Sequence, residues 1–143
     1  KIAVAQQGWL RTPHLQFVYA NALEYPLPES DAFILNDILH YMNYEHQRTL
    51  LLRCMEQLRP EGKLIVRDGN AANTRKHRLT RFTELLSTGI FSFNKTTEQL
   101  CFTSEAQIRN IAQEGGMQLE ILPNDRYTSN TIYIFQKNKP EHE

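Results

Sequence analysis

Two short runs of apolar residues lie near the middle of the chain, at residues 32–35 and within residues 63–67. Runs this short, with no polar residue inside them, are typical of strands buried on both faces of a parallel sheet. Between the two runs, apolar residues recur at the spacing of one helical face, which predicts a helix over residues 43–58 with Asn43 as its N-cap. The central pattern is therefore strand, helix, strand.

The rest of the pattern extends this alternation. It predicts helices over residues 1–10, 74–89 and 104–115, strands over 15–20, 118–122 and 131–136, an irregular or hairpin-like cover over 90–102, and a frayed tail over 139–143. Strands that alternate with helices predict an α/β fold, with a mostly parallel sheet and helices on both faces. Because a short turn joins the last two strands, we expect an antiparallel strand at one edge of that sheet.

Composition and charge narrow the function classes. With 143 residues the chain has the length of one domain, and we expect a single domain over residues 1–143. Sixteen basic residues balance sixteen acidic residues, which disfavours nucleic acids and anionic membrane surfaces as partners. No apolar run approaches the roughly 18 residues of a membrane span. The two cysteines form no metal-binding or disulfide pattern, which predicts a reducing, cytoplasmic location.

Three segments together resemble the class I S-adenosylmethionine-dependent methyltransferases. Residues 19–28 (YANALEYPLP) are similar to the family's segment after its third strand, and residues 31–42 (DAFILNDILHYM) to its fourth strand. Residues 58–66 (LRPEGKLIV) are similar to the turn into its fifth strand. The resemblance covers nearly the whole chain. It implies a Rossmann-like sheet, S-adenosylmethionine as cofactor, and methyl transfer to a small-molecule or lipid-like acceptor, without a metal.

The glycine-rich loop that cradles the methionine part of the cofactor in that family has no counterpart among the six glycines. The chain, which begins at Lys1 within a predicted helix, therefore resembles the C-terminal two-thirds of such a domain. We expect weak or undetectable cofactor binding by this chain alone. In the family's strand order, the missing strands would leave an open apolar edge at residues 33–35, which predicts a homodimer or swapped assembly. A noncatalytic, degenerate methyltransferase-like module with an assembly role is the alternative function.

The resemblance implies a set of cofactor contacts at the predicted strand ends. Asn21 would bind the adenine amino group, and the backbone N–H of Ala22 would reach a ring nitrogen. Asn36 and Asp37 follow a central strand at the end where open α/β sheets bind ligands, so we assign them to the cofactor as well. The alternative readings are that Asn21 only turns the chain and that Asp37 only caps a turn.

Catalytic and acceptor-binding candidates come from the same rim. His40 is a candidate general base, with Tyr41 beside it, although a structural histidine is the alternative. Arg67 and Asp68 follow the next strand and are candidates for acceptor binding, unless they form only a local pair. Arg78 belongs to a basic cluster at residues 75–81, which would suit an acidic or phosphate-bearing acceptor or be a solvated helix face.

Overall fold

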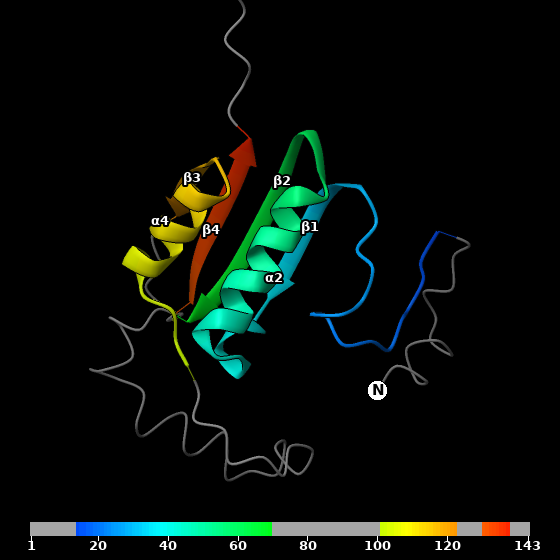
Figure 1. The fold of residues 1–143 in the computed structure, drawn as a ribbon, viewed down its shortest axis with the longest axis horizontal. Helices are drawn as coiled ribbons and strands as arrows, with labels where there is room; N and C mark the ends of the chain where they lie inside the picture. The colour runs from blue at the N-terminus through cyan, green and yellow to red at the C-terminus, as the bar shows by residue number, and fades with distance from the viewer. Residues whose placement is uncertain (1–13, 70–100, 123–129, 138–143) are drawn as a thin grey trace, which may run out of the picture.

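The computed structural model describes residues 14–69, 101–122 and 130–137, which form a mixed α/β fold (Figure 1). The elements are β1 (Ser30–Asn36), the short 3-10 helix η1 (Leu39–Tyr41), α2 (Tyr44–Glu56), β2 (Leu58–Gly69), α4 (Glu105–Glu114), β3 (Met117–Leu122) and β4 (Asn130–Lys137). The strand–helix–strand centre, the helix predicted over residues 104–115 and the two final strands are confirmed. The predicted elements at 1–10 and 74–89, the tail at 139–143 and most of the cover at 90–102 lie outside the described residues.

The four described strands form one sheet in the order β1-β2-β4-β3. β1 and β2 are parallel, and β4 is antiparallel to both β2 and β3. Strands β1, β2 and β3 therefore run in the same direction, as expected for a mostly parallel sheet, but the prediction that the antiparallel strand lies at the edge is wrong. The antiparallel strand β4 lies inside the sheet, because it pairs along seven residues of β2 as well as with β3, and β3 takes the edge.

Both described helices cover the same face of the sheet, as Figure 1 shows. Helix α2 connects the parallel strands β1 and β2, and α4 lies beside it, joined by an ion pair between Arg48 and Glu114. Between this helix layer and the sheet lies the core, which contains Leu50, Leu51, Cys54, Leu64, Val66, Ile108, Ile111, Tyr133 and Phe135. The helices expected on the opposite face are not present among the described residues, and Ile34 on β1 is 70% exposed.

Residues 15–20 do not form the predicted strand. They have no regular secondary structure and are exposed. The β-forming residues there lack a neighbouring strand among the described residues, and strand propensity alone does not satisfy backbone hydrogen-bonding groups.

Strand β2 begins at Leu58, earlier than the predicted residue 63, because Leu58 already pairs with Ser30 of β1; the register then shifts before Lys63 pairs with Ala32. Gly62 sits where the two strands approach closely, since a Cβ there would lie 2.9 Å from the Arg59 carbonyl oxygen and 3.0 Å from that of Asp31. None of the described helices is long and apolar enough to cross a membrane.

Candidate functional site

The carboxyl ends of the parallel strands β1 and β2 bring His40 and Asp68 together. His40 lies on η1, just after β1, and Asp68 is the penultimate residue of β2. The Nδ1 atom of His40 is 2.6 Å from Oδ1 of Asp68, and the two residues are 7% and 4% exposed. The other carboxylate oxygen accepts hydrogen bonds from the backbone N–H of Leu39 (2.7 Å) and of His40 (3.3 Å). The sequence prediction had placed both residues at this rim without pairing them.

Asp68 remains a carboxylate in this environment. Burial acts to raise its pKa, but the hydrogen bond and positive charge of His40 and the backbone N–H groups of Gly69 and Leu39 together hold the pKa below its ordinary value. Because a carboxylate only accepts hydrogen bonds, Nδ1 of His40 carries the proton. When the imidazole is neutral, Nε2 is therefore the basic nitrogen.

Aromatic rings and a backbone contact hold His40 on its other sides. The ring of Tyr41 lies 4.2 Å from the imidazole centroid, and the ring of Phe102 is stacked at 5.5 Å. The backbone N–H of Cys101 donates to the carbonyl of His40 at 3.0 Å. Within the part of the chain that the structure describes, no hydrogen bond to Nε2 of His40 is found. Among these contacts, Nδ1 is therefore the ring nitrogen that the protein binds.

The predicted adenine contacts lie in a turn that precedes β1. The side-chain oxygen of Asn21 accepts a hydrogen bond from the backbone N–H of Leu23 at 3.1 Å, as a turn-capping residue does. From α2, the guanidinium of Arg53 donates to the carbonyl of Ala22 at 2.9 Å and to that of Tyr25 at 2.6 Å. Asn21 thus makes the turn-capping contact that was the alternative to cofactor binding. Cofactor binding by Asn21 and Ala22 stays a prediction.

A second polar cluster joins Asn36, Asp37 and Arg67 at the strand ends. The guanidinium of Arg67 pairs with Asp37 and lies 3.3 Å from the side-chain oxygen of Asn36. The side-chain N–H₂ of Asn130 donates to Asp37 at 2.9 Å, and Asp37 itself has a φ of 53°. Because neighbouring strand residues point to opposite faces, Arg67 and Asp68 do not form the local pair considered from sequence. Their roles, and those of Asn36 and Asp37, stay predictions.

Three contributors to this region were missed from sequence: Gln47, Arg53 and Asn130. The signal for Gln47 was available, because it lies on the same helical face as core residues of α2. The other two carried no distinguishing pattern. Arg78 lies outside the described residues. Among the residues described, no group of histidine, cysteine or acidic side chains could hold a metal ion.

Solved structures of methyltransferases share this fold. Human N-acetylserotonin methyltransferase, solved with SAM (S-adenosylmethionine), is 18% identical with a TM-score of 0.68; the match covers 96% of this chain and 38% of that one. An O-methyltransferase family protein from Burkholderia thailandensis is 18% identical with a TM-score of 0.65, covering 88% of this chain and 36% of that one. The N-methyltransferase NodS from Bradyrhizobium japonicum WM9 is 17% identical with a TM-score of 0.66, covering 96% and 62%.

The chain thus spans about two-fifths of the first matching structures. A search of curated protein sequences found no match. The family model of the O-methyltransferase domain matches residues 2–118, which is most of the chain. With the shared fold and the match over these residues, this protein belongs to the O-methyltransferase domain family.

Proposed function

We propose that the protein takes part in methyl transfer from S-adenosylmethionine to a hydroxyl group of a small-molecule acceptor, with His40 as the general base. The observation that carries this proposal is the buried His40–Asp68 pair at the carboxyl ends of β1 and β2. Ligands of open α/β sheets bind at that end of the strands. The family membership supports oxygen as the methylated atom.

His40 and Asp68 have distinct roles in this mechanism. The Nε2 atom of His40 removes the proton of the acceptor hydroxyl as its oxygen attacks the methyl carbon. Asp68 keeps the imidazole oriented through Nδ1 and stabilises the imidazolium that forms. S-adenosylmethionine, when bound, would supply there a methyl group activated by a positively charged sulfur, which would keep the electron pair of the broken bond as a neutral thioether. General-base catalysis of this kind contributes about 10²- to 10⁴-fold to the rate.

The residues of the rim fit one side of the cofactor. Asn21 and Ala22 would contact the adenine, and Asn36 and Asp37 the methionine part. The side-chain oxygen of Asn21 accepts one hydrogen bond from Leu23 and has a second lone pair for an amino group. The acceptor would lie near three further residues of the chain, which are Tyr41, Arg67 and Arg78.

The substitution His40→Gln tests the proposal. Methyl transfer from radiolabelled S-adenosylmethionine to a panel of hydroxyl-bearing acceptors would be measured in the longest polypeptide that carries this chain. We expect kcat to fall by about 10²- to 10⁴-fold, with little change in cofactor affinity. The matched control is His46→Gln, because His46 is an exposed histidine on α2. Full activity in His40→Gln would rule out His40 as the base.

A noncatalytic assembly module is the second candidate. The observation that favours it is the position of β1, which pairs with β2 alone among the described strands and exposes Ile34. Open strand edges of this kind pair readily with other chains. This candidate predicts self-association of the chain through β1.

A further inference from the structure

Gln47 is a fully buried polar residue beside the His40 turn, with 0% of its surface exposed. Its side-chain nitrogen lies within hydrogen-bonding distance of three carbonyl oxygens, those of Leu39 (3.0 Å), Met42 (2.9 Å) and Cys101 (2.8 Å). Its side-chain oxygen accepts a hydrogen bond from the hydroxyl of Thr103. Every polar atom of this side chain therefore has a protein partner.

These partners belong to the two segments that enclose the imidazole. Leu39 precedes His40 on η1, and Met42 is the residue that follows the end of η1. Cys101 donates its backbone N–H to the carbonyl of His40, and Phe102, between Cys101 and Thr103, stacks on the ring. Gln47 thus ties the segment that carries His40 to the segment that packs against it, although the two are 61 residues apart in sequence (His40 to Cys101).

Gln47 is the polar exception among the buried residues of α2. Its neighbours on the same helical face are Leu50, Leu51 and Cys54, all buried. Removing the amide would leave buried carbonyl groups without a donor, so the loss would be felt in the two segments around His40. Asp68 binds Nδ1 of the ring and the backbone N–H groups of Leu39 and His40. Gln47 instead binds the carbonyl of Leu39 and that of Cys101, in the segment that packs against the ring.

We propose that Gln47 is a positioning residue for His40, acting through the backbone of both segments to hold the imidazole between Asp68 and Phe102. The effect of Gln47 on catalysis rests on the proposed function, whereas its effect on the position of the ring does not. Gln47 does not touch the acceptor in this assignment. Its effect is on the geometry of the base, so it governs turnover more than binding.

The first experiment observes the Nδ1 proton of His40 by NMR of the ¹⁵N-labelled protein, with His40→Gln to assign the signal. Gln47→Met keeps the length of the side chain and removes all its hydrogen bonds. Thr103→Val is nearly isosteric and removes only the hydroxyl donor, while Thr103→Ser restores it. We expect the Nδ1 proton to exchange at least about tenfold faster in Gln47→Met and faster in Thr103→Val, with Thr103→Ser close to the unaltered protein.

The control is Met55→Ala, which truncates a buried side chain on the last turn of α2. Among the described residues, the side chain of Met55 makes no hydrogen bond to the His40 turn. This substitution should destabilise the fold without a selective change at His40. Unchanged exchange of the Nδ1 proton in both Gln47→Met and Thr103→Val, or an equal change in Met55→Ala, would overturn the proposal.

The second experiment separates this proposal from the proposed function. In the transfer assay, Gln47→Met should lower kcat by about 10- to 100-fold with nearly unchanged KM values. If His40→Gln retains activity, the general-base role fails, while the NMR result still decides whether Gln47 positions the ring. If His40→Gln abolishes transfer but Gln47→Met leaves both the Nδ1 proton and kcat unchanged, only the positioning role of Gln47 fails.

Discussion

The carboxylate of Asp68 is the residue whose chemistry depends most on its surroundings. It is buried, yet two backbone segments and His40 all donate hydrogen bonds to it. These donors favour the charged form more than burial disfavours it, so the pKa of Asp68 lies below its ordinary value. The same interactions orient His40, which means that one carboxylate serves both the stability of the fold and the proposed catalysis.

Asp68→Asn should reveal this contribution as a function of pH. A carboxylate whose pKa is lower in the folded than in the unfolded state adds stability above its unfolded pKa, near 3.9, and loses it as the pH falls through the folded value. We expect Asp68→Asn to lower the free energy of unfolding by about 1–3 kcal/mol at pH 7. The difference should shrink when the pH falls below about 4. Urea unfolding across that range measures it.

The exposed Asp31→Asn serves as the comparison, since its side chain pairs with Arg59 at the surface. A difference between Asp68→Asn and the unaltered protein that stays constant down to pH 2 would contradict the assignment.

Helix α2 supports both halves of the candidate site. Near its start, Gln47 holds the segments around His40, and in its last turn Arg53 holds the turn that carries Asn21 and Ala22. The guanidinium of Arg53 contacts the carbonyls of Ala22, Leu23 and Tyr25, which otherwise belong to a segment without regular secondary structure. The element that packs the core is therefore also the one that shapes the proposed adenine side of the cofactor site.

Arg53→Met should loosen this turn while keeping the apolar stem of the side chain packed. We expect the backbone N–H of Leu23, which donates to the side chain of Asn21, to exchange with solvent at least about tenfold faster. Hydrogen exchange followed by NMR measures this rate. Arg59→Met is the matched control, because Arg59 pairs with exposed carboxylates elsewhere on the surface. Equal protection of Leu23 in both variants would show that Arg53 does not hold the turn.

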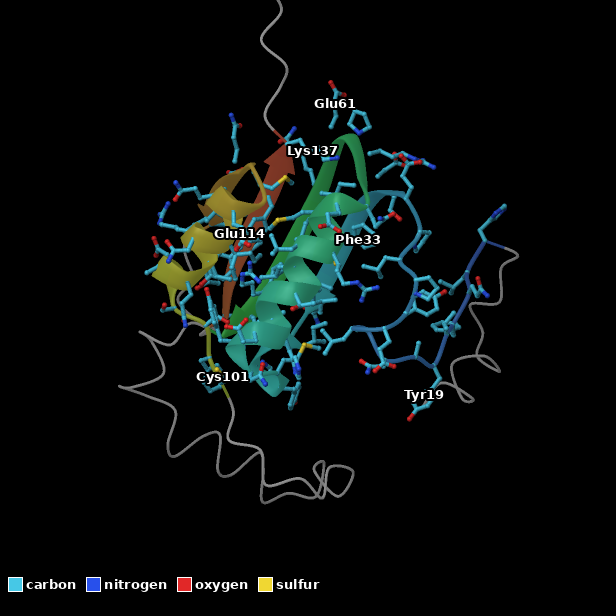
Figure 2. All side chains as sticks on the ribbon, viewed as in Figure 1. Tyr19, Phe33, Glu61, Cys101, Glu114 and Lys137 are labelled. Atoms are coloured by element: carbon cyan, nitrogen blue, oxygen red, sulfur yellow. The ribbon has the colours of Figure 1, made fainter. Side chains whose placement is uncertain are left out.

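At the scale of the whole molecule, one face of the sheet carries no helix among the described residues, and β1 and β3 are its two edge strands. Both helices pack on the same face, and β1 is an edge strand (Figure 1). In Figure 2, Phe33 lies near the upper part of β1, close to α2, whereas Tyr19 lies far from the sheet, on the segment that precedes it. The segment expected to pair as a strand thus does not cover the edge.

Self-association through this edge is expected for the chain, by pairing of β1 with a second copy. Ile34→Lys would place a charge on the exposed position of β1 and should weaken the association, because lysines on edge strands oppose pairing. Light scattering at increasing concentration measures the mass. Lys63→Ile is the control with the opposite change, because it replaces a charged residue by an apolar one on the neighbouring strand β2. A monodisperse monomer of the unaltered chain at high concentration would contradict the prediction.

Cofactor binding by this chain is expected to be weak or undetectable. The described residues offer candidate contacts at the carboxyl ends of β1 and β2 and in the turn before β1. The six glycines of the sequence form no glycine-rich motif of the kind that cradles such a cofactor. Calorimetric titration with S-adenosylmethionine tests this. A dissociation constant in the low micromolar range would show that these contacts suffice without such a loop.

The sequence predicted the elements whose signals are local. The apolar runs predicted β1 and the main part of β2, and the capping residue Asn43 marked the start of α2. It also placed the candidate residues at the rim, because polar residues after buried strands share one edge of a parallel sheet. The prediction of a strand at residues 15–20 was wrong because a strand also needs a neighbouring strand to pair with, and a local pattern does not show whether one is present.

Periodicity and caps, which depend on residues a few positions apart, therefore indicated which of these segments are helices and strands. Only the tertiary structure decided which of these residues contact one another. The pairing of His40 with Asp68, the pairing of Arg67 with Asp37 rather than with its neighbour, and the interior position of β4 all join residues far apart in sequence. Such contacts depend on strand register and on which face each side chain takes, and no local pattern records either.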